Sequence, residues 1–173
     1  MDVKISFESV FWTKDAYRQV AADFYPCHSK RLNLILHWIG AGIQMWGAVQ
    51  LLSHLNLQYI VYSLMGYVGL STPVLTAIPH TVLFYAFLTT PIPMEYISPL
   101  TVDLHPIIGC LLAFGCGFLK DVGHHVCHEP AFMGSYMKER PSLFFFHATW
   151  HLPFLIDAYS PFSIVQKTTK KVA

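Results

Sequence analysis

The sequence has very little charge. Only 12% of its 173 residues are Asp, Glu, Lys or Arg and 54% are hydrophobic, against roughly 25% and 45–50% in ordinary soluble domains. Between residues 32 and 94 there is no charged side chain at all. A helix rises about 1.5 Å per residue and the hydrocarbon core is about 30 Å thick, so this run is long enough for two or three crossings. We therefore predict an integral membrane protein.

Several functional motifs are also absent. The sequence contains no Gly-rich phosphate loop and no Gly-x-Ser-x-Gly element typical of hydrolases. Its four cysteines include no Cys-x-x-Cys pair, and we expect free, buried thiols. Basic residues are scattered and the formal net charge is +1, which argues against nucleic acid binding. Any chemistry is then expected to depend on a metal.

The predicted fold is all-α, a single membrane domain over residues 1–173 with about four transmembrane or re-entrant helices. The apolar runs and their boundaries place these helices near residues 31–55, 57–90, 102–128 and 142–159. Pro73 and Pro79 divide the second run into two short helices, or into one crossing and a broken return. Residues 1–30 are expected to form an amphipathic segment on the membrane surface or against another subunit, and residues 160–173 a polar tail.

Histidine, in contrast, is abundant, with ten residues. His124, His125 and His128 lie in one short stretch, and His147 and His151 are four residues apart. Residues with this spacing lie on the same face of a helix. Imidazole is the commonest metal ligand in proteins, so His124 with His128 fits one part of a metal site. For any single histidine, an interfacial position with the ring reaching toward water is the simpler interpretation.

Neighbouring side chains leave several roles open. Asp121 could fix the tautomer of a ligand ring, or simply pair with Lys120 or face water. Asn33 lies four residues before His37 and could orient its ring, or only begin the helix. His147 and His151 could add ligands for a second metal, supply protons or position a carboxylate substrate, or be held by hydrogen bonds from neighbouring helices.

Two motifs carry a resemblance to a known family. The first is His28-x4-Asn33-x3-His37-x2-Gly40 with Tyr25 before it, and the second is Val122-Gly123-His124 followed by Glu129-Pro130-Ala131. Together they resemble the integral-membrane 2-hydroxy fatty acid dioxygenases of phytosphingosine breakdown, in order and membrane pattern over residues 24–155. The resemblance implies an Fe(II) enzyme, typically of the endoplasmic reticulum, that shortens a 2-hydroxy fatty acid by its carboxyl carbon.

The resemblance also implies a set of site residues. It carries over His28, His37 and His124 as iron ligands, and helical spacing adds His128. The supporting or substrate-binding candidates around them are Asn33, Asp121, His125, Glu129, His147 and His151, with no catalytic residue expected beyond the ligands. A 2-hydroxy acid can chelate iron through its carboxylate and hydroxyl oxygens, which leaves a position for dioxygen.

Three other functions remain open on the sequence. A membrane di-iron lipid hydroxylase or desaturase would bind two irons. A structural subunit of a larger organellar membrane complex, for example a mitochondrial one, would keep the fold without the reaction. Bis-histidine haem binding would need ligands that face each other across two helices.

Overall fold

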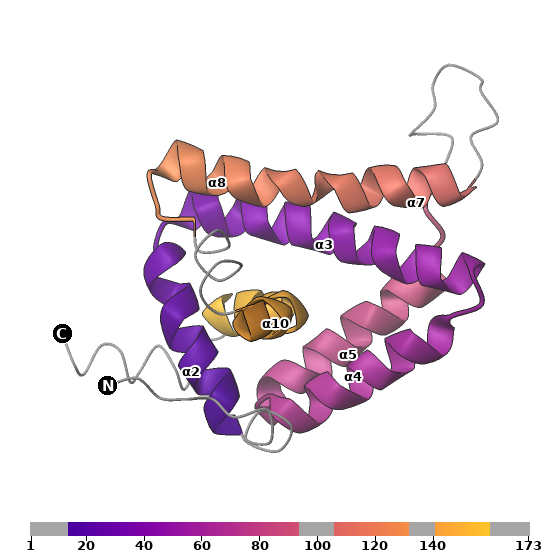
Figure 1. Ribbon diagram of the computed structural model, residues 1–173, viewed down its shortest axis with the longest axis horizontal. Coiled ribbons are helices and arrows are strands. Elements are labelled where there is room, and N and C mark those ends of the chain that lie inside the picture. Colours follow the sequence, from indigo (N-terminus) through magenta and orange to yellow (C-terminus); the bar gives the residue numbers. More distant parts are fainter. Residues whose placement is uncertain (1–13, 94–105, 132–140, 160–173) are drawn as a thin grey trace.

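A computed structural model describes residues 14–93, 106–131 and 141–159 (Figure 1). All regular secondary structure in these ranges is helical, which confirms the predicted all-α class. The elements are α2 (Lys14–Phe24), η1 (Tyr25–Cys27), α3 (Arg31–His54), α4 (Gln58–Ser71), α5 (Val74–Thr89), α7 (Pro106–Gly115), η2 (Cys116–Phe118), α8 (Leu119–Cys127) and α10 (Pro141–Tyr159).

The helices begin and end close to where the sequence placed them. The helix expected over residues 31–55 is α3, and the run over residues 57–90 is divided into α4 and α5. The division falls at Thr72, which precedes Pro73 and is extended, with φ −110° and ψ 161°, because proline disfavours helical geometry in the residue before it. Pro79 lies inside α5 without ending it. The predicted tail over residues 160–173 and the first part of the N-terminal segment lie outside the described residues.

The central contact of the fold is between α3 and the α7–η2–α8 segment, which run side by side in opposite directions (Figure 1). Two glycines of α3 set this approach. A Cβ atom at Gly47 would lie 2.6 Å from the carbonyl oxygen of Cys110, and one at Gly40 would lie 3.0 Å from the Cβ of Leu119. Small residues at such positions let helix backbones come close, as is common in membrane helix pairs.

The N-terminal helix α2 is amphipathic, as predicted, but its apolar face is covered by the protein itself. Tyr17 and Phe24 are fully buried. The Tyr17 ring lies 4.9 Å from that of Phe154 and 5.7 Å from that of Trp150, both on α10. We expected this face to rest on a membrane surface or on another subunit. The structure differs because α10 lies inside the molecule, between α2, α3 and the α4–α5 pair (Figure 1).

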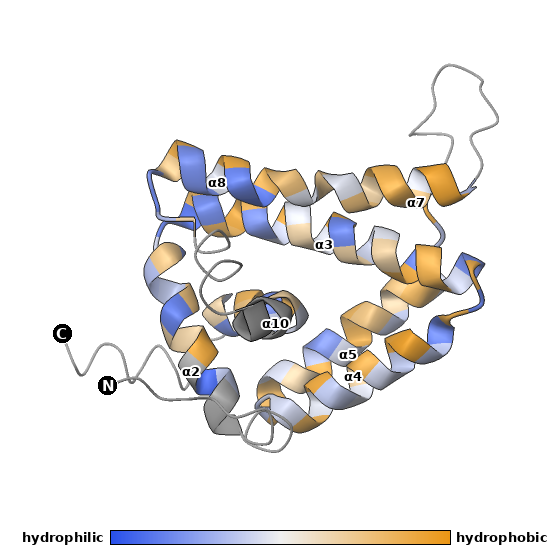
Figure 2. Ribbon diagram, in the orientation of Figure 1, coloured by the Kyte–Doolittle hydropathy of each residue, from blue (hydrophilic) through white to orange (hydrophobic). Residues whose placement is uncertain are grey.

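Several helices consist largely of apolar residues (Figure 2). Of the helices that the structure describes, the 22-residue stretch Pro106–Cys127 is long and apolar enough to cross a membrane. The helix α3 is as long, but it contains more polar side chains and does not meet this criterion. The shorter α4 and α5 still expose large apolar residues such as Leu70, Val82 and Tyr85. One helix therefore meets the length and composition of a membrane crossing.

The close contact between α3 and α7 predicts that a larger residue at Gly47 destabilises the fold. Gly47→Ala should lower the midpoint of thermal unfolding in detergent, because the added methyl group meets backbone atoms of Cys110 and Phe114 that cannot move aside alone. We expect a cost of about 1–3 kcal/mol. Gly42→Ala is the matched control on the same helix, because nothing lies within 4 Å of its new Cβ. Equal midpoints for the two variants would contradict the described packing.

Candidate metal centre

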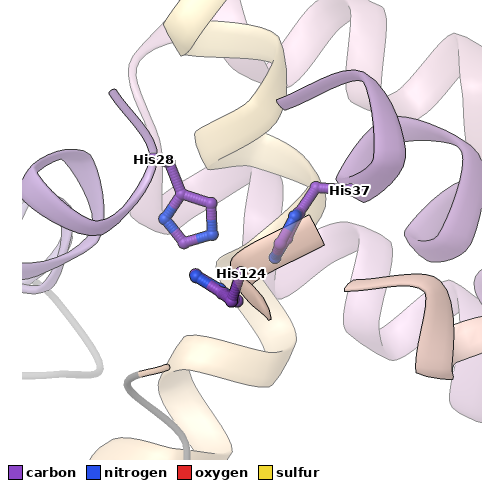
Figure 3. A group of neighbouring side chains, drawn as sticks. All are labelled: His28, His37 and His124. Atoms are coloured by element: carbon purple, nitrogen blue, oxygen red, sulfur yellow. The ribbon is translucent and has the colours of Figure 1, made fainter. Parts of the chain in front are cut away.

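Three histidines from three separate segments meet inside the protein (Figure 3). His28 follows η1, His37 lies on α3 and His124 on α8, and all three are buried. The ring centroid of His28 lies 4.3 Å from that of His37 and 4.7 Å from that of His124, and the other two are 4.7 Å apart. One ring nitrogen from each lies within 4.8 Å of the others. This group can hold a metal ion.

Two of these rings are fixed in the same way by the backbone. The Nδ1 of His28 lies 2.7 Å from the carbonyl oxygen of Phe24, and the Nδ1 of His37 lies 3.0 Å from that of Asn33. A carbonyl oxygen only accepts, so Nδ1 carries the proton in each neutral ring and Nε2 keeps its lone pair. The His28 ring also stacks on Phe24, with centroids 3.7 Å apart. Both rings therefore present an Nε2 atom suited to binding a metal.

The burial of His28 also favours the form that binds metal. Loss of solvent lowers the pKa of His28 from 6.5 to about 4, against smaller opposing effects of the Phe24 carbonyl and of the Glu129 charge. The ring is therefore neutral at physiological pH. Its Nε2 is buried and has no hydrogen-bond partner among the residues that the structure describes. A buried polar atom without a partner costs free energy, and a bound cation would satisfy it.

A buried carboxylate joins the two helices that carry His37 and His124. The Oε1 of Glu129 accepts hydrogen bonds from the backbone N–H groups of Ser29 and Lys30, at 2.8 and 2.9 Å, and from the Ser29 hydroxyl. Its Oε2 accepts one from the Nδ2 of Asn33 at 2.7 Å. The same Nδ2 lies 3.4 Å from the Nδ1 of His124. The carboxylate thus caps the start of α3, where a negative charge is also favoured by the helix dipole.

The hydrogen bonds keep Glu129 ionised. Burial raises the pKa of this carboxyl group, but the donors on Ser29, Asn33 and Lys30 together outweigh burial and leave the pKa below its usual range. The carboxylate reaches these donors because α8 ends at Cys127 and His128 takes a left-handed conformation, with φ 52° and ψ 39°. That turn directs the chain back toward the start of α3.

The structure brings some of the predicted site residues to this centre and leaves others outside it. Asn33 and Glu129 support the rings as described, and His151 is buried beside them, stacked 5.4 Å from His37. His128 was predicted to be a ligand, but it is exposed and lies outside the three-histidine group. The reason is that its left-handed backbone ends the helical spacing from His124.

The remaining candidates lie at the edge of the site or beyond the described side chains. His125 is exposed on α8. Asp121 is exposed as well, although it lines the cavity next to the centre. His147 belongs to α10, but its side chain lies outside the described residues. The supporting residues near the rings are therefore Asn33, Glu129 and His151.

A cavity of about 320 Å³ opens beside the three histidines. Besides His28, His37, His124 and His151, its walls include aromatic rings and two polar side chains, namely Phe114, Phe118, Gln44 and Lys120. Sequence reasoning did not select Gln44 or Lys120. A signal was available for Lys120, because it lies inside the Pro106–Cys127 stretch, which is apolar enough to cross a membrane, and a charge in such a stretch marks a functional position by default.

Three neutral imidazoles form a donor set that suits Zn(II) or Fe(II). Two nitrogens bound to one ion at about 2.1 Å are at most about 4.2 Å apart, so small inward movements of these rings would complete the site. No protein-family model, no curated protein and no solved structure matches the chain. The arrangement described here is the buried three-histidine group with a cavity on one side.

Replacing the buried carboxylate should weaken the fold in a pH-dependent way. In Glu129→Gln the amide would keep one acceptor for Ser29 and Lys30, but its NH₂ group would face the NH₂ group of Asn33. We expect a loss of about 1–3 kcal/mol at pH 7, seen as a lower thermal midpoint of the metal-free protein. Asp121→Asn, at an exposed carboxylate, is the control and should change little.

The pH dependence follows from the lowered pKa of Glu129. A group whose folded pKa is depressed stabilises the protein above its unfolded pKa, here about 4.5, and this stability is lost as the pH falls through the folded value. The difference between wild type and Glu129→Gln should therefore be largest at neutral pH and shrink below about pH 4.5. A difference that stays constant down to acid pH would show that the charge of Glu129 contributes nothing.

Proposed function

We propose that this protein is an integral membrane dioxygenase that holds Fe(II) on His28, His37 and His124 and removes the carboxyl carbon of 2-hydroxy fatty acids. The observation that carries the proposal is the meeting of three buried imidazoles from three segments beside a cavity. The two sequence motifs that resemble the dioxygenase family contain these three histidines. A membrane of the endoplasmic reticulum is the location that the resemblance implies.

The residues fit the needs of this chemistry. Bound Fe(II) would supply a centre that binds a chelating 2-hydroxy acid and dioxygen together, because three histidines leave other coordination positions open. The backbone carbonyls of Phe24 and Asn33 hold His28 and His37 with Nε2 directed inward. The burial of the three histidines would limit the access of water to a bound ion. The aromatic walls of the cavity suit an acyl chain.

The position of the site within the fold supports a membrane lipid as substrate. The three histidines lie near the start of α3 and the end of α8, and polar residues gather at this end of the molecule (Figure 2). The opposite end of the Pro106–Cys127 stretch is apolar. If this stretch crosses the bilayer, the centre lies near the membrane edge, where the polar head of a fatty acid also lies.

Metal analysis tests the centre directly. Protein purified in detergent and loaded anaerobically with Fe(II) should retain about one iron per chain. His37→Ala and His124→Ala should fall to background, because each removes one of the three nitrogen donors of the group. His125→Ala and His128→Ala are matched controls on exposed histidines of the same stretch, and both should retain the metal.

The outcomes of this experiment separate the functions that the sequence left open. Two irons per chain would favour a di-iron hydroxylase or desaturase. Negligible iron in wild type and variants alike would favour a structural subunit of a membrane complex. Loss of iron in His128→Ala with retention in His124→Ala would contradict the ligand set.

An activity assay tests the reaction. Fe(II)-loaded protein incubated with 2-hydroxypalmitate and dioxygen should form the acid that is one carbon shorter, and His124→Ala should reduce the rate to that of buffer with free Fe(II). The product is measured by mass spectrometry, and palmitate without the 2-hydroxyl group is the substrate control. If the protein binds one iron but leaves 2-hydroxypalmitate unchanged, the proposed reaction is contradicted and the metal centre is still supported.

A further inference from the structure

The cavity beside the histidines contains a positively charged side chain, that of Lys120. This residue lies inside the apolar Pro106–Cys127 stretch. Its Nζ donates a hydrogen bond to the Oε1 of Gln44 at 2.6 Å, and both side chains line the same cavity as the three histidines. Among the described residues, no carboxylate forms an ion pair with Lys120. The charge therefore has a neutral partner and an accessible cavity in front of it.

The partner of Lys120 packs against Gly117 of η2. A Cβ atom at Gly117 would lie 2.6 Å from the Cδ and Nε2 atoms of Gln44, so only glycine leaves room for this amide. Because the Oε1 of Gln44 accepts from Lys120, its NH₂ group is left as a donor, and no described residue accepts from it. The ammonium and the amide thus place two kinds of hydrogen-bond donor in one wall of the cavity.

The charges around the cavity favour an anion between this pair and the histidines. A divalent ion on three neutral imidazoles keeps its full charge, and Lys120 adds a further positive charge. The nearest buried carboxylate, Glu129, is already occupied by Ser29, Lys30 and Asn33. The exposed carboxylate of Asp121 also lines the cavity and balances part of this charge. An anionic ligand would complete the balance.

We propose that Lys120, positioned by Gln44, binds the carboxylate of an acyl-chain ligand next to the three histidines, and so makes the cavity selective for acids over neutral lipids. This inference rests on the proposed function for the identity of the acid. A carboxylate suits the site better than a phosphate because Lys120 is the one Lys or Arg side chain among the described cavity residues. Phosphate sites usually combine more donors, often from arginine.

The test compares an acid with its neutral counterpart. Binding of 2-hydroxyoctanoate and of 1,2-octanediol to the detergent-solubilised protein is measured by titration calorimetry, before and after treatment with EDTA. Wild type should prefer the acid by about tenfold or more, as expected for a charged hydrogen bond. In Lys120→Met the preference should fall to about one, while the affinity for the diol and the iron content stay unchanged. Lys120→Arg retains the charge and should keep most of the preference.

A second variant protects the test against a folding defect. Gln44→Leu leaves Lys120 in place but removes the group that orients it, so it should reduce the preference for the acid without abolishing it. Thermal midpoints confirm that each variant is folded. Unchanged preference in a folded Lys120→Met protein would overturn the inference, and so would tighter binding of octyl phosphate than of 2-hydroxyoctanoate by wild type.

The result also distinguishes this inference from the proposed function. Preference for the acid in EDTA-treated wild type, lost in Lys120→Met, would support the carboxylate site even if the protein retained no iron. The opposite result is also possible: the protein binds iron and shortens 2-hydroxypalmitate, but its Lys120→Met variant still prefers the acid. That result would support the dioxygenase and overturn the role of Lys120.

Discussion

The buried carboxylate of Glu129 connects the parts of this protein on which the site depends. It accepts hydrogen bonds from the start of α3 while it belongs to the segment that follows α8. These two places carry His37 and His124, which lie 87 residues apart in the sequence. An ionised carboxylate buried with donors to both oxygens is costly to displace. Glu129 therefore ties the two histidine-bearing helix ends together, in addition to the close packing of α3 on α8 at Gly40.

Near Glu129, backbone carbonyl oxygens orient two of the metal-binding rings. His28 and His37 each direct Nδ1 to a carbonyl oxygen four residues earlier. Such contacts need no additional side chain, so the space around the rings is filled by apolar groups such as Phe24. The same burial that stabilises the core keeps His28 neutral. Stability and readiness for metal thus have a common physical origin, the exclusion of water.

The polar groups of the cavity, in contrast, are only partly satisfied by hydrogen bonds. Lys120 and Gln44 satisfy each other only in part, because one carbonyl oxygen accepts from an ammonium group that has three protons to donate. This partly satisfied pair lies at the polar α8 end of the Pro106–Cys127 stretch. The aromatic residues Phe114 and Phe118 on the same walls offer it no further acceptors. The cavity thus combines an incompletely paired cation with a metal-binding group, and this combination is the basis for the proposed acyl-chain acid.

The sequence by itself determined the helices, because prolines and uncharged runs act locally on the backbone. It placed α3 to within a residue, and it named Pro73 and Pro79 as possible interruptions, of which Pro73 follows the break and Pro79 lies inside α5. It also contained the histidines that meet, but spacing along one helix paired His124 with His128, and the left-handed backbone of His128 separates them. The resemblance predicted His28, His37 and His124 as shared ligands, but only the tertiary structure decided that these rings lie together without His128 and that α2 packs on α10. The reason is that these contacts depend on how closely α3 packs against α7–η2–α8. The glycines that permit this packing do not show, in the local sequence, which helix they will contact.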